Sequence, residues 1–129
     1  MTKILIIEDD LEVLNLYKTA FAIEKFEVVT SEDGEEGLRK VKEEKPSLIL
    51  LDIMMPVLDG FQVLLRLKAD ATTSYIPVVV LTSLADVRDA QSCLYMGAVK
   101  YLIKSESTPK QIVDIVKETL GLAEPDKSL

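Results

Sequence analysis

Hydrophobic and polar positions follow one another along this chain in a repeating order. Short apolar runs occur at 4–7, 28–29, 48–51, 78–81 and 101–103. A longer segment with apolar residues at helical spacing follows each of them. Alternation of a short strand with a longer helix is typical of an α/β fold built around a parallel sheet. The pattern therefore predicts five strand–helix units.

The composition of the runs indicates where each strand lies in the sheet. Those at 4–7, 48–51 and 78–81 are continuously apolar, as expected of strands that helices cover on both faces. The segment 26–30 contains Glu27, so we expect it at an edge. Right-handed crossovers then favour the strand order 2-1-3-4-5, which is the order of the doubly wound, flavodoxin-like (βα)5 fold.

Helix signals indicate the extent of the domain. Tyr17 lies on the apolar face of the first predicted helix and is expected in the core. Thr108 is a capping residue at the start of the last helix, and Gly121 supplies its stop. We predict one domain over 1–122, followed by a C-terminal tail over 123–129 that is too short to form a second domain.

Composition and charge exclude several classes of function. The 129 residues carry a net charge of −7 and no basic stripe, which argues against direct binding of nucleic acid. No apolar run is long enough for a membrane span, and the single cysteine, Cys93, excludes an internal disulfide, so we expect a cytoplasmic protein. Because histidine is absent, imidazole catalysis is excluded and any metal must be held by oxygen.

Distinctive polar residues stand at the ends of four predicted strands. Glu8 and Asp9 follow the first strand, Asp52 the third, Thr82 the fourth and Lys104 the fifth. The carboxyl ends of parallel strands meet at one edge of the sheet, and the first and third strands are neighbours there, so the carboxylates should converge. Three carboxylates this close need a cation, and Mg²⁺ suits oxygen donors of this kind. Asp52 can then attack phosphorus while the hydroxyl and the ammonium bind phosphoryl oxygens.

The sequence resembles the response-regulator receiver family of two-component signalling. The resemblance spans residues 3–121 and rests on the segments 8–9, 52–60, 81–83, 97–98 and 101–104. It implies that Asp52 is the phosphoacceptor, assisted by Thr82 and Lys104. It also implies that Glu8, Asp9, Asp52 and the backbone carbonyl of Met54 hold Mg²⁺, and that Thr82 and Tyr101 are the switch residues.

The resemblance implies a phosphorelay mechanism. A phosphohistidine on a sensor histidine kinase or a histidine phosphotransfer protein donates its phosphoryl group to Asp52. The face formed by the fourth helix, the fifth strand and the fifth helix then changes its affinity for a downstream target protein. We expect a monomer or weak dimer that is not an enzyme beyond its own phosphotransfer and slow autodephosphorylation.

One position departs from the family pattern. Receivers usually have proline after the lysine of the fifth strand, joined through a cis peptide, whereas Ser105 follows Lys104 here. A cis bond before a residue other than proline costs about 2.5–4 kcal/mol. We therefore expect a trans bond, with Lys104 still reaching the phosphoryl site through its flexible stem.

Three other functions are compatible with parts of the pattern. A phosphatase of the haloacid-dehalogenase type has a second aspartate two residues after its nucleophile, where Met54 stands here. A flavodoxin-like electron carrier needs a phosphate-binding loop, whereas Glu8, Asp9 and Asp10 would repel phosphate. A pseudo-receiver scaffold that is never phosphorylated resembles receivers that have lost an acidic or lysine position. This chain retains all five of the polar positions at its strand ends, Glu8, Asp9, Asp52, Thr82 and Lys104. Both a single-domain regulator and a receiver of a longer protein fit the sequence.

Overall fold

The computed structural model describes residues 1–122, and in them five parallel strands form one sheet. Its order is β2-β1-β3-β4-β5, as the sequence predicts. The strands are β1 (Lys3–Ile7), β2 (Glu27–Ser31), β3 (Leu48–Leu51), β4 (Val78–Thr82) and β5 (Lys100–Ile103). The tail predicted over 123–129 lies outside the described residues.

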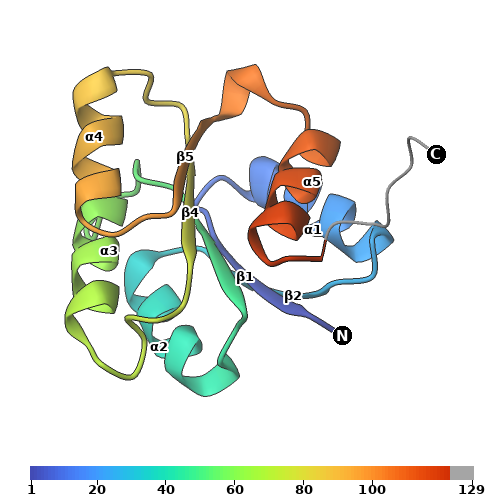
Figure 1. Ribbon diagram of the computed structural model, residues 1–129, viewed down its shortest axis with the longest axis horizontal. Coiled ribbons are helices and arrows are strands. Elements are labelled where there is room, and N and C mark those ends of the chain that lie inside the picture. Colours follow the sequence, from blue (N-terminus) through green and yellow to red (C-terminus); the bar gives the residue numbers. More distant parts are fainter. Residues whose placement is uncertain (123–129) are drawn as a thin grey trace.

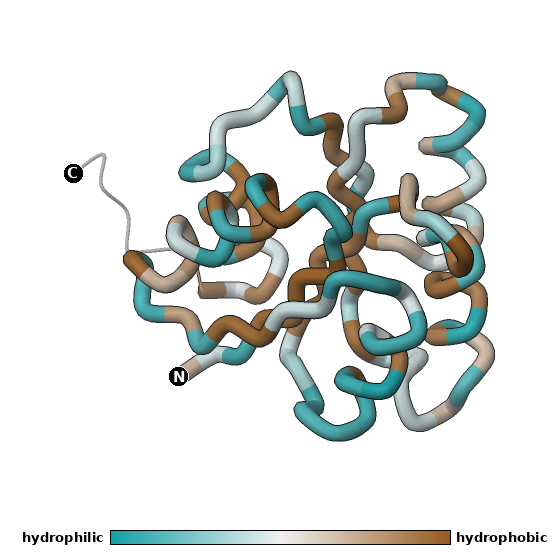
Figure 2. Tube along the Cα trace, turned by 180° about the vertical axis from the view of Figure 1, so that it is seen from behind, coloured by the Kyte–Doolittle hydropathy of each residue, from teal (hydrophilic) through white to brown (hydrophobic). Residues whose placement is uncertain are grey.

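Helices cover both faces of this sheet (Figure 1). The helices are α1 (Leu11–Ile23), α2 (Gly34–Glu44), α3 (Gly60–Ala69), α4 (Val87–Tyr95) and α5 (Pro109–Thr119). One buried cluster joins α1 and α5 to the sheet, and a second lies beneath α2, α3 and α4. The hydrophobic strands accordingly run through the middle of the molecule, between more hydrophilic outer turns (Figure 2). None of the helices in residues 1–122 is long and apolar enough to cross a membrane.

The strands differ in burial as their composition predicts. Every residue of β3 and β4 is buried, whereas Glu27 of β2 is exposed at the edge of the sheet. In β1, which pairs with β2 on one side and with β3 on the other, the last four residues are buried. The neighbouring carboxyl ends of β1 and β3 therefore lie in the interior of the sheet, where β1 and β3 diverge to their respective helices.

Polar side chains fix the starts of the helices that surround this edge. Asp10 caps α1 by accepting hydrogen bonds from the backbone N–H groups of Glu12 and Val13. Thr108 and Gln111 form the expected capping box of α5, with Pro109 in its first turn. These caps fix the exit of the chain from β1 and its entry into the last helix.

The chain leaves β5 through a 3₁₀ turn at Lys104–Glu106, an element that the sequence pattern did not predict. No peptide bond in residues 1–122 is cis, so the Lys104–Ser105 bond is trans, as expected without proline.

Candidate functional site

Strand alternation decides which polar side chains share a face of the sheet. Successive side chains on a strand point to opposite faces. In β1, Ile4 and Ile6 pack in the cluster under α1 and α5, whereas Leu5 and Ile7 pack on the other side. The same alternation, continued past the strand end, places Glu8 toward α1 and α5. Asp52 of the β3 end and Lys104 of the β5 end fall on that side for the same reason.

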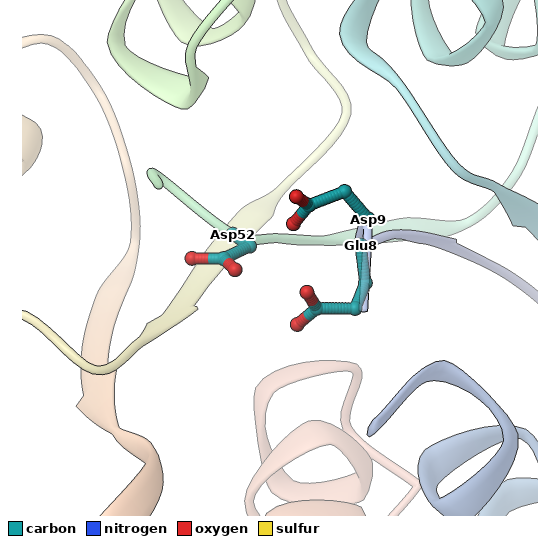
Figure 3. A group of neighbouring side chains, drawn as sticks. All are labelled: Glu8, Asp9 and Asp52. Carbon is teal, nitrogen blue, oxygen red and sulfur yellow. The ribbon is translucent and has the colours of Figure 1, made fainter. Parts of the chain in front are cut away.

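Three carboxylates converge where β1 and β3 end. Glu8, Asp9 and Asp52 each offer an oxygen, and these oxygens lie within 4.8 Å of one another. Glu8 and Asp9 leave the chain on opposite sides and flank the carboxylate of Asp52 (Figure 3). Glu8 and Asp52 are buried, while Asp9 is exposed. The sequence-based expectation of convergence at this edge is thus confirmed, and the arrangement is open to solvent on the side of Asp9.

Lys104 binds two of these carboxylates at once. Its Nζ lies 2.6 Å from Oε1 of Glu8 and 3.1 Å from Oδ2 of Asp52. The side chain of Lys104 keeps 17% of its surface exposed, against 4% for Glu8 and 5% for Asp52. The missing proline therefore does not turn the ammonium away from the site.

One ammonium does not balance the negative charge of this cluster. Burial raises the pKa of Glu8 to about 7, and the hydrogen bonds from Lys104 and from the backbone N–H of Asp10 do not cancel that effect. For Lys104, burial acts to lower the pKa, but the contacts with Glu8 and Asp52 outweigh it and the pKa is raised. The site thus favours a protonated lysine and leaves an excess of buried carboxylate charge that a proton or a metal cation can neutralise.

The loop after β3 wraps closely around Asp52. The backbone N–H of Met54 donates a 3.1 Å hydrogen bond to Oδ1 of Asp52, and the N–H of Gly60 donates to the carbonyl of Ile53 at 2.9 Å. A Cβ at Gly60 would come within 2.3 Å of the Asp52 carbonyl and 2.5 Å of the Ile53 Cα. Only glycine permits this approach, so the start of α3 is held against the backbone of Asp52 and Ile53.

Thr82 and Tyr101 lie on the other side of the sheet, toward α3 and α4. The Thr82 side chain is fully buried, and its hydroxyl accepts a 3.3 Å hydrogen bond from the backbone N–H of Leu84. The half-buried Tyr101 donates its hydroxyl to the carbonyl of Leu84 at 2.8 Å. Neither side chain hydrogen-bonds Asp52 in this structure, and both bind the same residue of the β4–α4 loop.

Two residues of the site were not identified from the sequence. The role of Leu84 rests on its backbone, which leaves no signal in side-chain identity. Tyr17 of α1 was assigned to the core, and it is buried there, but it also lines a cavity of about 10 Å³ together with Glu8 and Asp52. Strand alternation placed these carboxylates toward α1 and could have identified Tyr17.

The chain was compared with protein families and with curated proteins of similar sequence. Residues 4–117 match the response regulator receiver domain. The chain is 38% identical over 122 residues to the "Probable transcriptional regulator ycf27" of Cyanophora paradoxa, covering 95% of this chain and 49% of that protein. It is 40% identical over 102 residues to the "Transcriptional regulatory protein PrrA" of Mycobacterium tuberculosis, covering 79% and 43%. The chain thus spans about half the length of these curated relatives.

A solved structure agrees with the sequence comparison. The beryllofluoride-activated N-terminal receiver domain of RstA from Klebsiella pneumoniae superposes with a TM-score of 0.85 at 32% identity. The match covers 92% of this chain and 98% of that one.

Proposed function

This chain belongs to the response regulator receiver family of two-component systems, and we propose that it accepts a phosphoryl group on Asp52. One observation carries the proposal: the buried Asp52 carboxylate lies 3.1 Å from a lysine ammonium and within 4.8 Å of two further carboxylates. This combination provides a nucleophile, a donor for phosphoryl oxygens and a set of cation ligands in one place.

The donor set fits Mg²⁺. Three carboxylates in mutual reach carry more negative charge than Lys104 balances, and the exposed side at Asp9 leaves room for the waters that Mg²⁺ retains. Glu8, Asp9, Asp52 and the backbone carbonyl of Met54 would hold the ion. When bound, the ion supplies positive charge that offsets the charge of the transferring phosphoryl group.

Transfer requires one bond to form and one to break. An Oδ of Asp52 bonds to phosphorus as the phosphorus–nitrogen bond of a phosphohistidine breaks, and the released imidazole takes up a proton. Lys104 already contacts Oδ2, so its ammonium is placed to bind a phosphoryl oxygen. The Met54 N–H, which binds Oδ1, orients the carboxylate from the other side. The partner is a sensor histidine kinase or a histidine phosphotransfer protein.

We further propose that phosphorylation is transmitted through Thr82 and Tyr101. Both side chains are hydrogen-bonded to the backbone of Leu84. When the Thr82 hydroxyl moves toward the phosphoryl group, its hydrogen bond with the Leu84 N–H is lost. The β4–α4 loop, to which Tyr101 is hydrogen-bonded, is then free to move. Tyr101 belongs to β5, beside α4, so the change reaches the face formed by α4, β5 and α5. That face would bind the downstream target.

The chemistry proposed is a signalling event and not turnover of an external substrate. The protein acts on itself, through phosphotransfer to Asp52 and slow autodephosphorylation. The buried, unpaired Cys93 fits a cytoplasmic location, where thiols stay reduced. A pseudo-receiver scaffold would have the same fold without the phosphoryl group, and the experiment below separates the two.

Intact-mass analysis after incubation with acetyl phosphate tests the proposal. One added phosphoryl group is expected with Mg²⁺ and none with EDTA. Asp52→Asn should abolish the addition. Asp59→Asn is a matched control, because Asp59 caps α3 outside the carboxylate cluster and asparagine also caps helices well. Labelling that persists in Asp52→Asn would contradict the assignment, and an unlabelled wild-type protein would favour the pseudo-receiver.

A further inference from the structure

Tyr17 lines the same small cavity as Glu8 and Asp52, and the proposed phosphotransfer gives it no role. The residue keeps 5% of its surface exposed and sits on the buried face of α1. Side chains on an α-helix tilt toward its N-terminus, and the N-terminus of α1 follows immediately after Glu8, Asp9 and Asp10. The tyrosine ring therefore points from the core toward the site.

Tyr17 shares a small cavity with two of the carboxylate residues. The cavity has a volume of about 10 Å³ and is lined by Tyr17, Glu8 and Asp52, together with apolar residues of β1, β3 and β4. A space of roughly 10–15 Å³ accommodates one water molecule, which requires two to four polar partners. Glu8, Asp52 and Tyr17 are the lining residues with polar side chains, and apolar strand residues form most of the wall.

The hydroxyl of Tyr17 is available for this role. Within residues 1–122 it makes no hydrogen bond to another protein group. No fully buried side-chain polar atom in that part of the chain lacks a partner, so the hydroxyl oxygen borders accessible space. The electrostatic environment agrees: burial raises the pKa of Tyr17, and the charges of Lys104, Glu8 and Asp52 act on the phenol.

We propose that Tyr17 is a positioning residue of the phosphoacceptor site. Its hydroxyl binds one water in the cavity, and this water donates a hydrogen bond to the Glu8 carboxylate from below. The inference rests on the proposed function, because the carboxylate held in this way is one of the proposed Mg²⁺ ligands. Groups that orient a metal ligand in this manner affect metal affinity without touching the ion.

The water between Tyr17 and Glu8 matters most once Asp52 is phosphorylated. Lys104 is shared between Glu8 and Asp52, at 2.6 Å and 3.1 Å. When its ammonium turns to a phosphoryl oxygen, the contact with Glu8 weakens while that carboxylate stays buried. The water held by Tyr17, with the Asp10 N–H that lies 3.1 Å from Oε2, then keeps Glu8 hydrogen-bonded.

Tyr17→Phe tests the inference, because it removes the hydroxyl and leaves the shape of the core unchanged. The amide signal of Asp10 in ¹H–¹⁵N NMR spectra reports on the Glu8 carboxylate that its N–H binds. We expect this signal to shift in metal-free Tyr17→Phe and Mg²⁺ titrations to give an affinity about tenfold weaker than wild type. Tyr75→Phe, on a side chain that is 73% exposed, should match wild type in both measurements.

A second measurement uses the wild-type protein alone. A nuclear Overhauser contact between the Tyr17 ring and a long-lived water is expected, and it decides the matter even if the variant folds poorly. Absence of that contact, or a Tyr17→Phe protein with an unchanged Asp10 signal and unchanged Mg²⁺ affinity, would overturn the inference. If the wild-type protein neither bound Mg²⁺ nor became phosphorylated, the proposed function would fail instead. The Asp10 amide shift without metal and the contact between Tyr17 and water would still test the role of Tyr17.

Discussion

The hydroxyl of Tyr101 donates a 2.8 Å hydrogen bond to the backbone carbonyl of Leu84. This bond ties β5 to the β4–α4 loop across 17 positions of the chain. Burial, as the largest effect, raises the pKa of Tyr101 to about 12, so the phenol remains a donor throughout the physiological range. The same loop residue donates its N–H to Thr82, and the two side chains thus both hold the loop through the backbone of Leu84.

Tyr101→Phe should destabilise the unphosphorylated protein. Loss of one hydrogen bond to a backbone carbonyl costs about 0.5–1.5 kcal/mol of the free energy of unfolding. Urea denaturation measures this change, and amide hydrogen exchange should speed up in the β4–α4 loop. Tyr95→Phe is the control. Tyr95 is 93% exposed, so the loss of its hydroxyl should leave the free energy of unfolding unchanged. Equal stability of wild type and Tyr101→Phe would show that the bond does not restrain the loop.

Val57→Gly should stabilise the fold. Val57 has φ +66 and is the central residue of a tight turn in which the Leu58 N–H binds the Pro56 carbonyl at 2.8 Å. A γ-turn with positive φ is strained, and the strain is greatest for a β-branched residue. The side chain is 99% exposed, so its removal loses no packing. Relief of strain outweighs the added flexibility of the unfolded chain, giving a gain of about 1 kcal/mol.

Lys45→Gly is the matched control for this change. Lys45 also has positive φ, at +48, but it is not β-branched and it ends α2 in the left-handed conformation common at helix C-termini. Its replacement should therefore stabilise less than Val57→Gly. A Val57→Gly protein that unfolds at lower urea concentration than wild type would refute the claim of strain.

Right-handed crossovers favoured the strand order 2-1-3-4-5, which was adopted as the order of the flavodoxin-like fold. Given that order, the geometry of parallel strands predicted the convergence of Glu8, Asp9 and Asp52. The hydrogen bonds of Leu84 could not be predicted, since they are made by backbone atoms that any residue possesses. The positive φ of Val57 could not be predicted either, because valine favours extended structure, whereas the chain makes a tight turn between Pro56 and Leu58. Tertiary contacts thus determine the details next to Asp52.

Stability without metal should fall as the pH rises. Burial raises the pKa of Glu8 from 4.5 to about 7, so folding favours its protonated form. This contribution to stability is complete below about pH 4.5 and is lost as the pH rises through about 7. In the proposed site Mg²⁺ would replace the proton as the balancing charge, so it should raise Tm more near pH 8 than near pH 5. Thermal denaturation in EDTA and in Mg²⁺ at both pH values measures the difference.

Glu8→Gln isolates the source of this pH dependence. The amide cannot ionise, so the fall in Tm between about pH 5 and pH 8 in EDTA should be smaller than in wild type. A Mg²⁺ effect of equal size at both pH values in the wild-type protein would show that ionisation of Glu8 is not linked to cation binding.

Asp70 should contribute stability with the opposite pH dependence. Its Oδ1 accepts hydrogen bonds from the Thr72 hydroxyl at 2.7 Å and from the Thr72 N–H at 2.9 Å, and its Oδ2 lies 3.0 Å from the Lys42 ammonium. These partners, the Thr72 hydroxyl foremost, lower the pKa of Asp70 to about 2. A lowered pKa means that the ionised form is favoured by folding, so the contribution is present above about pH 4 and is lost as the pH falls through about 2.

Asp70→Asn removes the ionisable group and keeps an oxygen that can accept from Thr72. Urea denaturation should show the variant less stable than wild type near pH 6, and the gap should close as the pH falls from about 4 to 2. Asp114→Asn is the control, because Asp114 makes only an exposed i,i+4 contact of 3.6 Å with Lys110, and such pairs contribute little at any pH. If the gap between wild type and Asp70→Asn stayed constant down to pH 2, the loss would come from altered packing or hydrogen-bond geometry at the end of α3. The charge of Asp70 would then have no part in joining α2 to the α3–β4 connection.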